Sequence, residues 1–195
     1  MRIVAVVGMT GCGKTEVSKI FVEHGFEYVR FGQAVLDEVM RRDLEVNEKN
    51  ERMVREELRK THGMDAMAKF LIPIFDNLIK QKNVVADGLY SWEEYFLLKK
   101  RYNDNLVVLA IYAGPKTRYK RLSERKLDVK KDKKAINRPY TLEQAMSRDY
   151  SEIENLHKAG PIAMADFTII NEGSVEELMA KIKDFIKKQF PIQQV

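Results

Sequence analysis

An α/β fold with a parallel sheet is predicted by three observations on the sequence. Five short apolar runs alternate with helical segments, the order of elements typical of parallel sheets. These runs are Ile3–Val7, Glu27–Arg30, Asn83–Asp87, Leu106–Tyr112 and Phe167–Ile170. Capping boxes mark three helix starts, at Ser91, Thr141 and Ser174. A glycine-rich loop joins the first run to a helix-like stretch, and 195 residues suffice for one core, so we expect residues 1–195 to form a single domain.

The composition is that of a water-soluble chain with a heavily charged surface. Hydrophobic residues make up 45% and charged residues 32% of the chain, and its single cysteine fits a reducing cytoplasm, where we expect the protein to reside. The longest apolar run, Leu106–Ala113, is far shorter than the about 20 residues of a membrane helix. We therefore expect no membrane partner.

The loop after the first strand matches the pattern G-x-x-x-x-G-K-[ST], which binds phosphates. Its residues are Gly8, Met9, Thr10, Gly11, Cys12, Gly13, Lys14 and Thr15. A glycine-rich turn lets successive backbone N–H groups point at phosphate oxygens, and the next helix adds its positive N-terminal end. We expect Lys14 to reach the β- and γ-phosphates and Thr15 to ligate Mg²⁺.

Asp87 ends the third predicted strand, within Val84–Gly88. An aspartate in this place is expected to be a second Mg²⁺ anchor. Alternatively it accepts or orients the proton of an attacking hydroxyl, or it caps the strand by binding the amides of Gly88 or Ser91.

Two insertions interrupt the alternation of strands and helices. The first, residues 33–82, is predicted to hold three helices, Gln33–Arg42, Asn47–Thr61 and Met64–Lys80. Gly32 and Gln33 open it, and Arg30 just before it is either a phosphate ligand or a surface arginine at a strand end. Both insertions would project from the carboxyl edge of the sheet, where such sheets bind ligands.

The second insertion, residues 118–149, carries the excess positive charge. Ten Lys or Arg and three Asp or Glu lie between Arg118 and Arg138, so this segment nets +7 in a chain of net +5. Arg121, Arg125, Arg138 and Arg148 are candidates to neutralise charge on a transferring phosphoryl group. The spacing of Arg121 and Arg125 predicts that both lie on one helix face. The alternative is an electrostatic patch for RNA, weakened because no aromatic residue interleaves Arg121–Arg138.

Together these motifs resemble the nucleoside-monophosphate-kinase-like branch of P-loop proteins, especially an archaeal adenylate kinase-related family, with likeness to dephospho-CoA kinases. The marks are GMTGCGKT, VRFGQ, VVADG, AGPKTRYKRLSER and ADFTIINEGSVEEL. The resemblance implies a three-layer α/β/α P-loop fold with sheet order 2-3-1-4-5. It implies donor ATP and Mg²⁺ on the loop, the acceptor against the first insertion, and a basic lid over residues 118–149.

The same resemblance implies roles for residues of the lid and of the last loop. Arg121 and Arg125 look like the adenine-side and phosphate-side lid arginines, and Arg138 and Arg148 like a later pair. Asn171 to Gly173 matches the loop that lines the donor adenine, largely through its backbone.

Three positions depart from the family pattern on the acceptor side. Gln33 stands where relatives usually carry aspartate, Leu36 lies near an expected acceptor-binding arginine, and Tyr90, after Asp87-Gly88-Leu89, stands where close relatives tend to carry arginine. With Arg30, Gly32, Gln33, Gly88 and Tyr90 as candidate acceptor contacts, these departures leave the acceptor open.

The leading hypothesis is an ATP- and Mg²⁺-dependent phosphotransferase acting on AMP or a related nucleotide-like molecule. The alternatives are a dephospho-CoA-kinase-like enzyme, or a nucleotide-binding ATPase or sensor that acts with an RNA or protein partner. The sequence does not give the oligomeric state.

Overall fold

The structure, a computed structural model, describes residues 1–125 and 139–191. Its centre is a five-stranded parallel sheet of order β2-β3-β1-β4-β5, which confirms the expected fold class and strand order. The strands are β1 (Ile3–Val7), β2 (Glu27–Arg30), β3 (Val84–Asp87), β4 (Leu106–Tyr112) and β5 (Phe167–Ile170). The predicted strands are therefore confirmed, with only the start of β3 displaced, by one residue.

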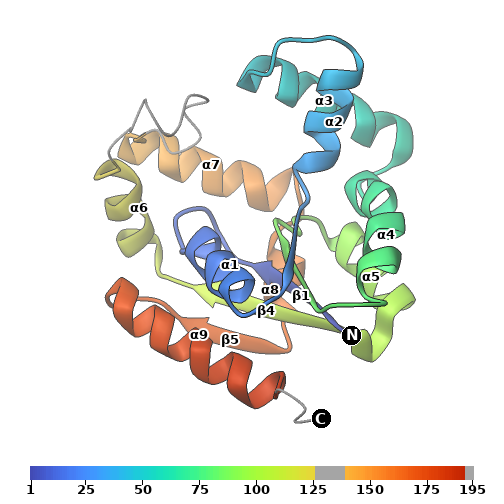
Figure 1. Ribbon diagram of the computed structural model, residues 1–195. Coiled ribbons are helices and arrows are strands. Elements are labelled where there is room, and N and C mark those ends of the chain that lie inside the picture. Colours follow the sequence, from blue (N-terminus) through green and yellow to red (C-terminus); the bar gives the residue numbers. More distant parts are fainter. Residues whose placement is uncertain (126–138, 192–195) are drawn as a thin grey trace.

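Helices cover both faces of this sheet (Figure 1). They are α1 (Lys14–Glu23), α2 (Gln33–Arg41), α3 (Glu48–His62), α4 (Ala66–Leu78), α5 (Trp92–Tyr102), α6 (Pro115–Ser123), α7 (Leu142–Glu154), α8 (Ala159–Ala163) and α9 (Val175–Gln189), with a short 3₁₀ turn at Asn103–Asn105. The three helices predicted in the first insertion are present as α2, α3 and α4, with ends shifted by one or two residues.

The central strand β1 is buried along its whole length, and its side chains alternate between two cores. Ile3, Ala5 and Val7 belong to a cluster that includes residues of α2, α3, α4 and α5. Val4 and Val6 belong to a second cluster, formed with α1 and α9. Because α9 buries Leu178, Ile182, Phe185 and Ile186, its apolar stripe packs on the sheet as predicted, although Val175 at its start is exposed.

The predicted helix caps are present. Complete capping boxes begin α5 at Ser91 and α7 at Thr141, and the Ser174 hydroxyl accepts a hydrogen bond from the Glu177 amide at the start of α9. In the described part of the chain, no helix combines the length and the apolar character needed to span a membrane.

Parallel pairing brings the carboxyl ends of the inner strands to one edge of the sheet. Val6 of β1 pairs with Asp87 of β3, which in turn pairs with Arg30 of β2. The phosphate-loop motif leaves β1 at this same edge. The residues that the sequence marks as chemical are therefore neighbours in the fold.

Candidate functional site

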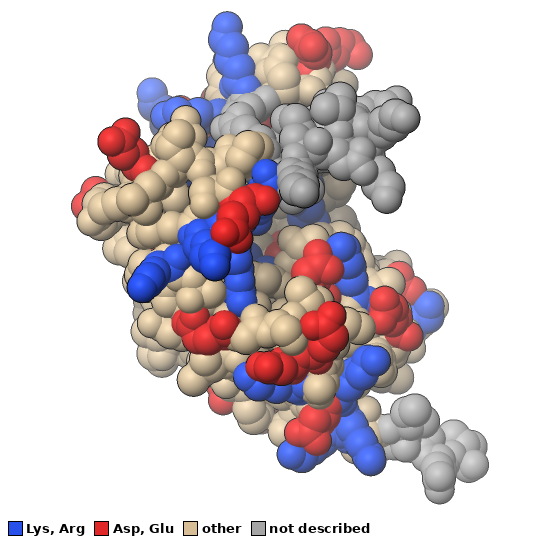
Figure 2. Space-filling model, turned by 90° about the vertical axis from the view of Figure 1, so that its left-hand side faces the viewer, with Lys and Arg blue, Asp and Glu red and all other residues tan. Residues whose placement is uncertain are grey.

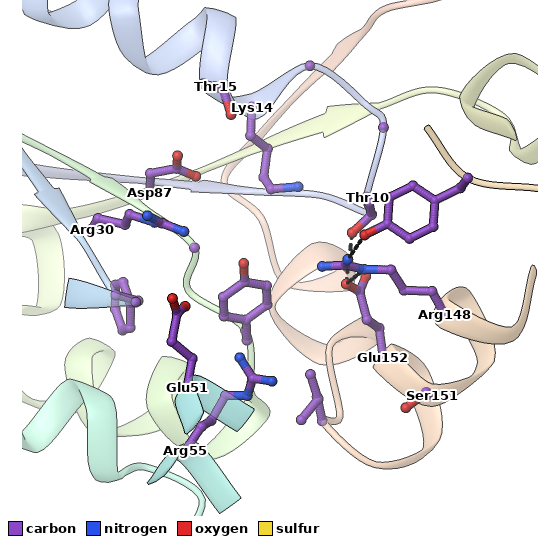
Figure 3. A pocket seen from close by; sticks show the side chains of 18 of the residues that line it. Thr10, Lys14, Thr15, Arg30, Glu51, Arg55, Asp87, Arg148, Ser151 and Glu152 are labelled. Atoms are coloured by element: carbon purple, nitrogen blue, oxygen red, sulfur yellow. Dashed lines mark hydrogen bonds and ion pairs between the residues drawn. The ribbon is translucent and has the colours of Figure 1, made fainter. Parts of the chain in front are cut away.

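A cleft of about 2020 Å³ opens at this edge of the sheet. Its walls come from the loop after β1, the ends of β2 and β3, helices α3 and α7, and the loop after β5 (Figure 3). Among the predicted site residues it is lined by Thr10, Gly11, Gly13, Lys14, Thr15, Arg30, Gly32, Asp87, Gly88, Tyr90, Arg121, Arg125, Arg148, Asn171 and Gly173. Gly8, Met9, Cys12 and Gln33 are not among its lining residues.

The backbone of the loop from Gly8 to Thr15 adopts positive φ angles that glycine tolerates best. Gly8 has φ 144° and Gly13 φ 105°, values that side-chain-bearing residues rarely adopt. A Cβ at Gly13 would also lie 2.6 Å from Nδ2 of Asn171. Cys12 is buried in the core under the loop and fits the interpretation as a small packing residue.

Lys14 crosses the mouth of this loop. Its ammonium donates hydrogen bonds to the carbonyl oxygens of Gly8 at 2.7 Å and Met9 at 3.2 Å. Burial alone would lower the pKa of Lys14, but the acidic groups around it, Glu152 and Asp87 among them, raise its pKa above the ordinary value. Lys14 is therefore a partly buried cation held at the loop.

The donor set at the loop fits a magnesium–triphosphate group. Helix α1 begins at Lys14, so its first amides have no earlier partner within the helix and are available to an anion. Thr15 and Asp87 both line the cleft and would supply one hydroxyl and one carboxylate oxygen. Among the described residues, no cluster of three or more His, Cys, Asp or Glu side chains is placed to hold a metal ion.

The ends of β2 and β3 form the floor next to the loop. Asp87 accepts a hydrogen bond from the Tyr28 hydroxyl at 3.2 Å, and burial together with this carboxylate raises the pKa of Tyr28 to about 12. Arg30 lies beside Asp87 and points into the cleft (Figure 3). The prediction that Gln33 contacts a substrate gains no support, because its amide donates to Asp37 on the same helix instead.

The described arginines of the predicted lid, residues 118–149, have different surroundings. Arg121 donates to the backbone oxygens of Asn171 at 2.9 Å and Gly173 at 3.0 Å, so it ties α6 to the loop after β5. Arg125 makes no hydrogen bond or ion pair with any described residue, and burial lowers its pKa. The prediction that Arg121 and Arg125 share a helix face is wrong, because α6 ends at Ser123.

Arg138 and Arg148 were also predicted to be site residues of the lid, and only one of the two lies in the described part of the chain. Arg138 lies outside the described residues. Arg148 is placed in the cleft wall on α7, where it donates to the Glu152 carboxylate at 3.0 Å and to the Tyr140 hydroxyl at 2.5 Å.

Sequence reasoning missed a buried network of hydrogen bonds and ion pairs centred on Glu152, the partner of Arg148 (the Glu152 hub). The Glu152 carboxylate also accepts a hydrogen bond from the Thr10 hydroxyl at 2.8 Å (Figure 3). A further hydrogen bond comes to this carboxylate from the Lys158 ammonium at 2.6 Å. Burial would raise the pKa of Glu152, but the cations of Lys158 and Arg148 lower it to about 2. The i,i+4 spacing of Arg148 and Glu152 could have indicated part of this network.

Lys158 is the most buried charge of the hub. Only 1% of its surface is exposed, and its ammonium lies 4.6 Å from the centre of the Tyr90 ring. Burial lowers the pKa of Lys158 to about 8. Tyr90, predicted only as an acceptor contact, is thus also a support for the charges behind the phosphate loop.

A second group that sequence reasoning missed lies on α3. Arg52, Arg55, Arg59 and Lys60 line the cleft together with Glu51. Arg55 and Glu51 face Asp87 and Arg30 across it (Figure 3). The recurrence of charged residues at 51, 55 and 59 is a helical signal that could have been seen. It places arginines on the side of the cleft where the sequence predicted an acceptor, and where Leu36 and Tyr90 had suggested a deficit of positive charge.

Acidic and basic side chains are interspersed over the face shown in Figure 2. The described part of this face therefore presents no uniformly basic surface of the kind typical of nucleic-acid binding. Lys130, Lys131, Lys133 and Lys134 of the basic segment lie outside the described residues.

Comparison with solved structures agrees with the fold. A shikimate kinase from Bacteroides thetaiotaomicron superposes with a TM-score of 0.59 at 13% identity, covering 95% of this chain and 98% of that one. A gluconokinase from Sinorhizobium meliloti gives a TM-score of 0.53 at 12% identity, covering 99% and 98%. Identities this low carry the fold alone.

Sequence comparison identifies nearer relatives. A family model described as an AAA domain matches residues 4–155. A UPF0200 protein of Thermococcus kodakarensis is 33% identical, with 94% of this chain and 96% of that protein covered. A UPF0200/UPF0201 protein of Archaeoglobus fulgidus is 34% identical over 96% of this chain but only 56% of its own length. Likeness of this extent, over a P-loop nucleotide-binding fold, shows that the chain belongs to the UPF0200 family and carries its AAA domain.

Proposed function

We propose that this protein is an ATP- and Mg²⁺-dependent phosphotransferase that acts on a nucleotide or nucleotide-like small molecule. The observation that carries the proposal is the cleft itself, in which a phosphate loop with a partly buried lysine faces a carboxylate and several arginines. The charged residues of α3 lie across the cleft from the loop, where a second, anionic substrate would bind. The family resemblance makes AMP the first acceptor to test.

The donor triphosphate would lie along the loop, with its γ-phosphoryl group directed into the cleft. The first amides of α1 and the Lys14 ammonium would hold the β- and γ-phosphates, and Thr15 would hold Mg²⁺, which would neutralise phosphate charge. Asp87 would either anchor the same ion or accept the proton of an attacking hydroxyl. Arg148 and Arg125 line the cleft and would approach the transferring group from the other side. Catalysis would come mainly from positioning and charge neutralisation.

Substituting Lys14 tests the role of the loop. We expect Lys14→Ala to lower phosphoryl transfer by roughly 10²–10³-fold, because a positioned charge on the transferring phosphates is lost. Transfer from γ-labelled ATP and the rate of ADP release measure this. Lys116→Ala is the matched control, since Lys116 is exposed on α6 outside the cleft lining. Unchanged turnover in Lys14→Ala would remove the loop from the mechanism.

A panel of acceptors separates the proposed function from its alternatives. Labelled ATP is offered with AMP, with dephospho-CoA and with no acceptor. Transfer to dephospho-CoA alone would favour the dephospho-CoA-kinase-like alternative. Hydrolysis without transfer, joined to RNA binding that weakens steeply with salt, would favour a partner-dependent ATPase or sensor.

A further inference from the structure

The α3 side of the cleft contains a buried arginine whose charge is poorly matched by its surroundings. The Arg59 side chain is 9% exposed and lines the cleft. Its nearest carboxylate oxygen, Oε1 of Glu94, lies 3.9 Å from Nη2, which is beyond hydrogen-bond distance. Neither Nε of Arg59 nor Oε1 of Glu94 has a hydrogen-bond partner. A buried guanidinium with an unused donor is costly, and an anion in the cleft would offset that cost.

Glu94 compensates this charge only weakly. Its other oxygen, Oε2, accepts hydrogen bonds from the amides of Tyr90 at 2.9 Å and Ser91 at 3.1 Å, so the carboxyl group is fixed at the start of α5. Burial raises the pKa of Glu94 to about 7. Because a substantial fraction of Glu94 is protonated near neutral pH, Arg59 retains net positive charge facing the cleft.

A second arginine adds to the positive charge that faces this part of the cleft. Arg55 lies one helical turn before Arg59 on α3, and its guanidinium points into the cleft (Figure 3). Burial lowers the pKa of Arg59; the charge of Glu94 opposes this shift, and the charge of Arg55 adds to it, as expected for two cations facing the same space. One end of the cleft is therefore a site for an anion.

The opposite end has the chemistry of a hydroxyl site. Asp87 lies there beside the phosphate loop, and Glu51 of α3 also points toward this region (Figure 3). Carboxylates accept hydrogen bonds from a hydroxyl and repel an accepting phosphate, although Arg30 beside Asp87 offsets part of that repulsion. Arg121 and Arg148 do little to reverse this, because Arg121 binds backbone oxygens and Arg148 binds Glu152.

We infer that the acceptor is a hydroxyl compound with an anionic group, phosphate or carboxylate, that Arg55 and Arg59 anchor while the hydroxyl lies at Asp87. The inference rests on the proposed phosphotransferase activity. The hydroxyl oxygen attacks the γ-phosphorus, the bond from that phosphorus to the β–γ bridging oxygen breaks, and the hydroxyl proton passes to the Asp87 carboxylate. The products are ADP and a phosphate ester. For AMP the ribose hydroxyl, and not the phosphate, would be the accepting group.

Matched acceptors test the inference. The purified protein is incubated with γ-labelled ATP and with two pairs that differ in the anionic group, AMP against adenosine and gluconate against glucose. We expect the anionic member of at least one pair to have the lower KM, with the label in an ester on a hydroxyl. Preference in the AMP pair identifies a phosphate anchor, and preference in the gluconate pair a carboxylate anchor.

Substitution of Arg59 supplies the second measurement. We expect Arg59→Gln to raise the KM of the preferred anionic acceptor by roughly 10- to 100-fold, with little change in the KM of ATP or of the neutral partner. Arg59→Lys should recover part of the loss. Arg41→Gln is the matched control, because Arg41 is an exposed arginine on α2 outside the cleft. Thermal unfolding of each variant confirms that it folds.

Three results would overturn the inference. They are conversion of AMP to ADP with label in the β-phosphate, equal use of anionic and neutral acceptors, and an Arg59→Gln effect that is the same for both members of a pair. Failure of the proposed function looks different, because then no acceptor of any kind becomes labelled although ATP still binds.

Discussion

Glu94 is completely buried at the start of α5, and its ionisation makes stability depend on pH. The ordinary pKa of a glutamate is 4.5, and burial raises that of Glu94 to about 7. Between these values the native protein keeps a proton that the unfolded chain has lost. The contribution of Glu94 to stability is therefore present below pH 4.5 and is lost as pH rises to about 7.

Glu94→Gln should remove this pH dependence while keeping an oxygen for the Tyr90 and Ser91 amides. We expect the free energy of unfolding of the variant, relative to wild type, to rise by up to about 3 kcal/mol between pH 4.5 and pH 8. Urea unfolding at a series of pH values measures this difference. A difference that stays constant over the series would show that Glu94 does not titrate in this range.

At the scale of single residues, the sequence predicts sites whose residues are contiguous in the chain. It misses sites whose residues are brought together only by the tertiary structure. The loop from Gly8 to Thr15 is visible because its eight residues carry the whole pattern. Glu152 and Lys158 are invisible as a site, because only the fold brings them to Thr10 and Tyr90. Arg59 is an ordinary charged helix residue until its burial against Glu94 is known.

Among the helices, α5 follows a residue, Ser91, that caps its first turn and also bonds another segment of the chain. The Ser91 hydroxyl accepts a hydrogen bond from the Glu94 amide and donates one to the carbonyl of Met64, just before α4. Ser91 is fully buried. It therefore fixes α5 relative to the start of α4 as well as completing the first turn of α5.

Replacing this cap should cost more than replacing an exposed one. We expect Ser91→Ala to lower the free energy of unfolding by about 2 kcal/mol, because the Glu94 amide and the Met64 carbonyl both lose a partner. Ser174→Ala at the exposed start of α9 should cost about 0.5–1 kcal/mol. Chemical denaturation of both variants gives the comparison, and equal losses would argue against a tertiary role for Ser91.

Element boundaries were predictable where caps and periodicity agree. The boxes at Ser91 and Thr141 mark the starts of α5 and α7. The end of α6 was not predictable in this way, because the alternating charges after Ser123 carry no glycine or proline stop. That is why Arg121 and Arg125 were expected on one face, although α6 ends before Arg125.

Across the whole molecule, two cores meet at one strand. β1 contributes alternate side chains to the clusters on the two faces of the sheet. The loss of either cluster would therefore expose one face of the strand that positions the phosphate loop. Local propensity could not predict this arrangement, and the strand order was implied by family resemblance, because strand pairing depends on contacts distant in sequence.

A core substitution in the first insertion tests how tightly the insertion is coupled to the sheet. Phe75 and Phe70 lie on α4, the first fully buried and the second 41% exposed. We expect Phe75→Ala to lower the free energy of unfolding by about 3–5 kcal/mol, and Phe70→Ala by less than about 1 kcal/mol. Far-ultraviolet circular dichroism and tyrosine fluorescence should report one coincident transition. Separate transitions would show that the insertion unfolds by itself.

The two ends of the segment between Arg125 and Pro139 are fastened to each other. Arg118 of α6 forms a buried double hydrogen bond with Asp149 of α7, and the Tyr140 amide donates to the Leu122 carbonyl at 3.1 Å. A chain whose anchor points are clamped can change in length at a cost of only about 0.6 kcal/mol per doubling. The length and charge of the chain between these two clamps can therefore change without moving α6 and α7, which form part of the cleft wall.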